Sequence, residues 1–124
     1  MRFLIDSHAF IWWSEGLPAL GSAAHEAISD PANEVLVSIA ALWEITIKTS
    51  SGKLSLPSDL ETITTDQGFA VLPISFAHLR CLAGLPRLHR DPFDRMMIAQ
   101  ALAEGMPIAT ADRVFAGYRV QVIW

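Results

Sequence analysis

Four acidic residues of this sequence interrupt apolar surroundings, and their side chains suit a bound divalent cation. They are Asp6 at the end of MRFLID, Glu44 within SIAALWEITIK, Asp94 within DPFDRMMIAQA and Asp112 directly after IATA. A carboxylate among apolar neighbours costs several kcal/mol to desolvate unless a positive or hydrogen-bonding group compensates it. Carboxylate oxygens are the preferred ligands of Mg2+ and Mn2+, whose coordination is often completed by substrate phosphates. The four acids therefore predict a metal site for phosphodiester hydrolysis, provided that the fold brings them together.

Short apolar runs alternate with longer amphipathic segments, which predicts a parallel β-sheet covered by helices on both faces. The runs typical of strands are 3–6, 34–38, 70–73, 107–110 and 120–124. The segments typical of helices are 8–15, about 22–30, 39–50, about 59–67, 75–83 and about 91–104. Ligands of such sheets bind beyond the carboxyl ends of the strands, where the strand order reverses. Asp6 and Asp112 each lie at or just past such an end, so they can meet at one edge.

Helical periodicity places Asp94 on the buried face of the last long helix. It shares that face with residues 97, 98, 101 and 102, all of which are apolar. The run Asp91-Pro92-Phe93-Asp94 also resembles a helix start, with an N-cap, a proline at the first position and an acid at the third. A capping role for Asp91 and a metal-binding role for Asp94 are compatible.

Glu44 is the only charged residue between Glu34 and Lys48, in a helix that is apolar nearly all round. The alternative to a functional role is an i,i+4 ion pair with Lys48, which contributes only about 0.3–0.5 kcal/mol at a surface. That is a weak reason to place an acid among apolar residues. Glu44 is therefore grouped with the other three acids.

The composition predicts one domain, 1–124, because a chain of 124 residues is long enough for one core and too short for two. We expect a cytoplasmic protein without a membrane segment, since no uncharged stretch approaches roughly 18 residues and no secretory signal opens the chain. The single cysteine, Cys81, agrees with a reducing compartment. A hydrophobic fraction of 52% leaves apolar side chains for an interface, so a homodimer or a protein partner is expected.

Basic side chains concentrate in the last third of the chain. Residues 1–79 hold three basic and nine acidic side chains, whereas residues 80–124 hold six basic and four acidic ones. The loop that leads into DPFDR is surrounded by Arg80, Arg87, Arg90 and Arg95, with His89 between them. This places charge that suits phosphate beside a proposed metal ligand, and a solvated loop with ordinary surface arginines is an equal alternative.

Four segments together resemble a PIN-domain protein, specifically the VapC-type toxin of a bacterial toxin–antitoxin pair. They are MRFLIDSHAFIWW, SIAALWEITIKTSSGKL, HRDPFDRMMIAQALAEG and IATADRVF, and the resemblance runs nearly end to end. It implies a three-layer α/β/α fold with a central parallel sheet of about five strands and an acidic pocket at their carboxyl ends. The family's acids, in their order and approximate spacing, match Asp6, Glu44, Asp94 and Asp112.

The activity that the resemblance implies is cleavage of RNA by an endoribonuclease that uses Mg2+ or Mn2+, with a cognate antitoxin as partner. Asp6 and Asp94 are expected to bind the metal directly, Asp112 next, and Glu44 through water. Carboxylates that share a site repel one another, so without the cation at least one of their pKa values should be raised.

Several residues near this pocket keep two interpretations. Ser7 and Thr110 match small hydroxyl positions, where they bond a carboxylate or a metal-bound water, or else satisfy a local turn. Arg95 and Arg113 either contact phosphate or are solvated. The tryptophans 12, 13 and 43 line the core or a groove that binds the antitoxin.

Three other functions compete with the ribonuclease. A phosphatase with an aspartyl nucleophile also has Asp after its first strand, but usually with a second acid two positions later, where this chain has His8. A catalytically inactive domain that binds RNA or a partner is disfavoured because all four acids are present. A stand-alone nuclease that cleaves DNA or RNA stays open, since carboxylates alone do not select the nucleic acid.

Overall fold

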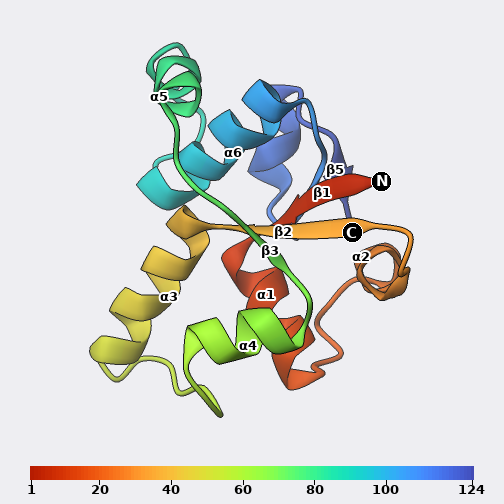
Figure 1. The fold of residues 1–124 in the computed structure, drawn as a ribbon. Helices are drawn as coiled ribbons and strands as arrows, with labels where there is room; N and C mark the ends of the chain where they lie inside the picture. The colour runs from red at the N-terminus through yellow and green to blue at the C-terminus, as the bar shows by residue number, and fades with distance from the viewer.

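The computed structural model describes residues 1–124 and contains a five-stranded parallel sheet with helices on both faces (Figure 1). The strands are β1 Arg2–Ile5, β2 Glu34–Ser38, β3 Ala70–Leu72, β4 Ile108–Ala109 and β5 Val122–Ile123. The helices are α1 Ser7–Glu15, α2 Ser22–Ser29, α3 Ile39–Ser50, α4 Leu60–Asp66, α5 Phe76–Ala83, α6 Pro92–Glu104 and the 3-10 helix η1 Arg113–Tyr118. The three-layer α/β/α prediction is confirmed, as are all five strands.

The strand order β3-β2-β1-β4-β5 makes β1 the centre of the sheet. The chain adds β2 and β3 on one side of β1, then crosses to the other side for β4 and β5. Because crossovers between parallel strands are right-handed, α1 to α4 cover one face and α5, α6 and η1 cover the other. Figure 1 shows this division, with α5 and α6 above the sheet and α1 and α4 below it. The order reverses between β1 and β4, where Ile5 is paired with Ala109.

The central strands β1 and β2 are apolar in the middle, after their exposed first residues Arg2 and Glu34, because both of their faces are covered there. Phe3, Leu4 and Ile5 have no exposed surface, and the core continues into Met97 and Ile98 of α6. Continuous apolar runs of this kind are expected in a parallel sheet that is buried on both faces. Burial of the inner face of α6 fixes this helix over the sheet. No helix is both long enough and apolar enough to cross a bilayer.

Short polar side chains begin most of the helices by accepting a backbone N–H of the first turn. These N-caps are Asp6 for α1, Ser38 for α3, Asp59 for α4, Ser75 for α5 and Asp91 for α6. The predicted capping role of Asp91 is confirmed. Asp6 therefore ends β1 and starts α1, which fixes its carboxylate at the edge where the strand order reverses.

The sequence did not predict η1, the segment between β4 and β5. Only Phe115 and Tyr118 of this element are buried, and their spacing of three residues follows the period of a 3-10 helix. One turn of so short a helix carries no extended periodicity that would reveal it. The Asp112 carboxylate caps η1 by accepting the backbone N–H of Val114 at 2.9 Å.

Candidate active site

Asp6 lies at the carboxyl end of the central strand and is held from two sides. Its Oδ1 accepts the backbone N–H of Ala9 at 2.8 Å, and its Oδ2 accepts the hydroxyl of Thr110 at 2.6 Å. The residue is only 5% exposed, and this burial raises the pKa of its carboxyl despite the two hydrogen bonds, which lower it. The Thr110 bond crosses from β1 to the end of β4. It therefore joins the two strands at the point where the strand order reverses.

Glu44 reaches the same edge from α3. The hydroxyl of Ser7, the residue after Asp6, donates to Glu44 Oε1 at 2.5 Å. The ion pair that the sequence offered as the alternative is also present, with Lys48 Nζ at 3.6 Å from Glu44 Oε2. The Glu44 side chain is 13% exposed against 35% for Lys48, so the carboxylate is the more deeply placed partner. Glu44 therefore faces the pocket and pairs with lysine at its margin.

Asp94 lies in the first turn of α6, behind the cap that Asp91 forms with the backbone N–H groups of residues 93 and 94. The pKa of Asp94 is raised from 3.8 to about 7, first by burial and then by the negative charges of Asp91, Glu44 and Asp6, while the charge of His89 lowers it. The predicted repulsion among the acids is thus present, but burial is the larger cause. Two of these acids, Glu44 of α3 and Asp6 after β1, act on Asp94 from other elements.

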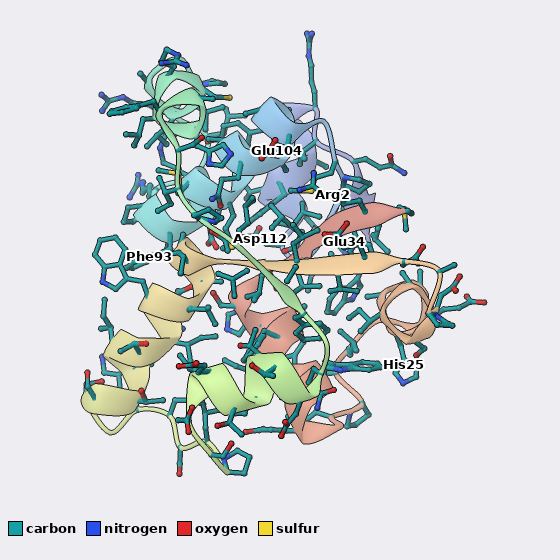
Figure 2. The ribbon with its side chains drawn as sticks, viewed as in Figure 1. Arg2, His25, Glu34, Phe93, Glu104 and Asp112 are labelled. Carbon is teal, nitrogen blue, oxygen red and sulfur yellow. The ribbon has the colours of Figure 1, made fainter.

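Asp112 and Asp94 are bridged by a histidine. His89 Nε2 lies 2.7 Å from Asp112 Oδ2 and 3.2 Å from Asp94 Oδ2. His89 Nδ1 accepts the backbone N–H of Asp91 at 3.1 Å, so the proton of the neutral ring is on Nε2 and points at the two carboxylates. The backbone of Asp112 is also held in place, because its N–H donates to the Thr110 hydroxyl at 3.0 Å. Figure 2 labels Asp112 and also Phe93, which precedes Asp94 in α6.

A continuous series of bonds therefore joins the four acids that the sequence singled out. Ser7 connects Glu44 to the Asp6 end of β1, Thr110 connects Asp6 to Asp112, and His89 connects Asp112 to Asp94. The Ser7 and Thr110 hydroxyls bond carboxylates, as one of their two interpretations predicted. Thr110 also satisfies the local turn, so both of its interpretations are correct.

The donor set fits a hard divalent cation. Ligand atoms of His89, Asp94 and Asp112 lie within 4.8 Å of one another. Asp6 and Glu44 are not part of this group, but their negative charges help to raise the pKa of Asp94. His89 presents an N–H rather than a lone pair at Nε2, so the oxygens of the acids are the candidate ligands. Such an all-oxygen set suits Mg2+ or Mn2+. The carboxyls of Asp6 and Asp94 have raised pKa values, and a bound cation would favour their ionised forms.

The sequence placed His89 in the basic loop and missed its bridging position, and it assigned no role to Tyr118. The Tyr118 hydroxyl accepts the backbone N–H groups of Leu88 at 2.9 Å and of His89 at 2.6 Å. Arg95 donates to the same hydroxyl at 3.3 Å and to Pro86 O at 2.9 Å. The only signal in the sequence was the position of His89 two residues before the N-cap of α6.

Arg113 keeps both of its interpretations. It is exposed, and its side chain forms no ion pair with an acid and no hydrogen bond within the chain.

Comparison with known protein families identifies the family of this fold. The PIN domain matches residues 3–120, nearly the whole chain. The chain belongs to the PIN domain family. No curated protein matches it by sequence.

Solved structures similar to this PIN domain include toxin–antitoxin proteins of three bacteria. VapBC2 from Rickettsia felis, bound to a promoter DNA fragment, has a TM-score of 0.72 and 13% identity over 98% of this chain and 97% of the other. VapBC-1 from nontypeable Haemophilus influenzae has a TM-score of 0.69 and 16% identity over 98% of this chain and 96% of the other. VapBC-5 from Mycobacterium tuberculosis has a TM-score of 0.61 and 20% identity over 98% of this chain and 97% of the other. At these identities the likeness concerns the fold.

Proposed function

We propose that this PIN domain is a metal-dependent endoribonuclease and the toxin of a toxin–antitoxin pair. The observation that supports the proposal is the cluster of His89, Asp94 and Asp112. Thr110 links Asp6 to Asp112 where the strand order reverses, and Ser7 binds Glu44 beside Asp6. Membership of the PIN family supports nuclease chemistry at these acids. A cytoplasmic location and a single nuclease domain, 1–124, are parts of the same proposal.

The four acids would hold Mg2+ or Mn2+, with Asp6, Asp94 and Asp112 as direct ligands and Glu44 through water. When bound, such a cation lowers the pKa of a water molecule and stabilises negative charge on the phosphodiester. The remaining groups keep the acids in place for this role. Thr110 orients Asp6, Ser7 orients Glu44, and the Nε2 proton of His89 is shared between Asp112 and Asp94.

Cleavage of RNA, rather than of DNA, follows from the resemblance to VapC-type toxins. The test incubates the purified protein with single-stranded RNA and single-stranded DNA, in Mg2+ or Mn2+ and then with excess chelator. We expect cleavage of RNA that chelator abolishes and that Asp6→Asn abolishes. Asparagine is as good an N-cap as aspartate, so this change keeps the start of α1.

Asp59→Asn is the matched control, because Asp59 is also a helix N-cap but starts α4 and forms no bond with the acids of the pocket. It should cleave RNA as the wild type does. Persistent cleavage by Asp6→Asn would contradict the proposed site. Cleavage of DNA alone would indicate a stand-alone DNA nuclease, and RNA binding without any cleavage would indicate an inactive PIN-like domain.

We propose a cognate antitoxin as the protein partner, supported by the solved neighbours, which are toxin–antitoxin proteins. A hollow of about 850 Å3 beside α1 and α2 is lined by Trp12, Trp13, Leu17, Pro18 and His25, among others. Tryptophan side chains supply much of the binding energy of protein interfaces. A short adjacent reading frame for a DNA-binding protein should yield a product that copurifies with this chain and blocks cleavage. Its failure to do so would contradict this partner.

We further propose a homodimer that buries an apolar stripe of α3. Ile39, Trp43 and Ile47 recur every four residues along α3 and are 41–58% exposed. Isolated exposed apolar residues are common, but a row of them along one helix indicates an interface. Sedimentation should give a dimer for the wild type and a monomer for Trp43→Glu. A monomeric wild type would contradict the proposal.

A further inference from the structure

Three arginines and His89 line a hollow of about 490 Å3 directly beside the acidic pocket. The lining residues are Arg87, His89, Arg90 and Arg95, and none of them is apolar. His89 is shared between the two regions, since its Nε2 contacts Asp94 and Asp112. A positive hollow and a negative pocket thus share one histidine.

None of the three arginines of this hollow forms an ion pair within the protein. Arg87, Arg90 and Arg95 form no ion pair with any carboxylate, whereas Arg2 and Lys48 elsewhere are paired with glutamates. Three guanidinium groups around one hollow repel one another, so the arrangement favours an anion that neutralises them. Guanidinium groups match the oxygens of a phosphate in planar, two-pronged geometry.

The hollow is held in shape by hydrogen bonds from two other elements. The Tyr118 hydroxyl of η1 accepts two backbone N–H groups of the loop, those of Leu88 and His89. Arg95 of α6 donates through Nη1 to Pro86 O and to the Tyr118 hydroxyl, which leaves its other N–H groups free to donate to a ligand. Arg87 and Arg90 therefore extend from a braced loop. A preorganised site loses less conformational entropy when a ligand binds.

We propose that this arginine hollow binds an RNA backbone phosphate that neighbours the cleaved one. The inference rests on the proposed function, because it takes the acidic pocket as the site of the scissile phosphate. A strand that crosses from the acids to the arginines would have one phosphate on each side of His89. The contacts are to the backbone, so the hollow aligns the strand without selecting its sequence.

The test measures binding of a fluorescein-labelled single-stranded RNA by anisotropy at several salt concentrations, in an Asp6→Asn background that prevents cleavage. A plot of the logarithm of the binding constant against the logarithm of the salt concentration has a negative slope, and each lost phosphate contact makes it shallower by about 0.7 for a single strand. We expect Arg87→Gln with Arg90→Gln to weaken binding and to reduce the magnitude of the slope by about 0.7, because one phosphate contact is lost. Arg87→Lys should retain most of the slope, because it keeps the charge.

Arg80→Gln is the matched control, since Arg80 lies in the last turn of the neighbouring α5 but does not line the hollow. It should bind RNA with unchanged affinity and slope. Unchanged binding by the Arg87/Arg90 double variant would overturn the inference. Equal losses in the double variant and in Arg80→Gln would overturn it as well, because the effect would then come from net charge alone.

A second measurement locates the phosphate and separates this inference from the proposed function. Neutral methylphosphonate linkages are placed in the RNA one at a time beside the cleaved bond. Cleavage is measured with the wild type and with the Arg87/Arg90 double variant, both of which retain Asp6. One such linkage should raise the KM of the wild type but should not raise the KM of the double variant any further. If RNA is cleaved and no linkage has this effect, the inference fails while the nuclease stands. If the wild type cleaves nothing but the salt slopes behave as expected, the nuclease fails and the arginine hollow remains an RNA-binding site.

Discussion

Replacing Asp94 with asparagine should stabilise the metal-free protein at neutral and alkaline pH. The pKa of Asp94 is raised from 3.8 to about 7, first by burial and then by the charges of Asp91 and Glu44. Between about pH 4 and pH 7 the folded protein therefore holds a proton that the unfolded chain has released. The stability that this group contributes is complete below about pH 4 and is lost as the pH rises through about 7. Asparagine cannot ionise and avoids that loss.

The size of the effect follows from the shift. One pKa unit corresponds to about 1.36 kcal/mol, so the shift of Asp94 to about 7 corresponds to at most about 4 kcal/mol. The side chain is 22% exposed, and access to water reduces this penalty. We expect Asp94→Asn to raise the free energy of unfolding by about 2–4 kcal/mol near pH 8 and by less than about 1 kcal/mol near pH 4.

Urea unfolding of the wild type and Asp94→Asn in excess chelator, at the two pH values, measures this difference. Asp59→Asn is the control, because hydrogen bonds from Thr62 lower the pKa of Asp59 rather than raise it. That variant should lose stability near pH 8 instead of gaining it. A destabilised Asp94→Asn near pH 8, or an equal gain at both pH values, would refute the reasoning.

Three further changes test the bonds that position the pocket. Thr110→Val removes a hydrogen bond that lowers the pKa of Asp6, so the acid limb of the pH profile of RNA cleavage should move to higher pH. Tyr118→Phe removes the hydroxyl that accepts two backbone N–H groups of the loop before α6, so hydrogen exchange of that loop should accelerate and cleavage should slow. Gly21→Ala would bring a Cβ within 2.7 Å of Trp124 Cδ1, and urea unfolding should show a loss of about 1–3 kcal/mol.

Two of these changes have a matched control. Thr110→Ser retains the hydroxyl and should leave the pH profile near that of the wild type. Gly84→Ala should be tolerated, since the nearest atom to an added Cβ there is 3.8 Å away. An unmoved pH profile, unchanged loop exchange in Tyr118→Phe, or a fully stable Gly21→Ala would each contradict the corresponding contact.

The acids and the elements that carry them were predictable because each has a local signal. Asp6 and Asp112 follow apolar runs that can only be buried strands, and Asp94 lies on an apolar helical stripe. Periodicity and composition report on burial, and a charge within a buried pattern is conspicuous. Glu44 was singled out by its apolar surroundings, which left the Lys48 ion pair as an alternative, and the family resemblance supported a functional role. The structure contains both the Ser7 bond and the Lys48 ion pair.

The bridge and its support were not predictable because they depend on contacts between distant residues. His89 meets Asp112 across 23 positions, and Tyr118 meets the loop across 29 and 30. No spacing within either segment indicates such a contact. Tyr118 also belongs to η1, a 3-10 helix too short for its period to appear in the sequence. Both groups owe their roles to the way η1 packs against the start of α6.

The central claim is that four distant carboxylates share one divalent cation. Anomalous diffraction from a crystal of the protein with Mn2+ tests this most directly, because the signal comes from the metal itself. We predict a peak between Asp94 and Asp112, bordered by Asp6 and Glu44, that disappears in Asp94→Asn. A wild-type crystal with saturating Mn2+ and no peak among these four acids would contradict the account.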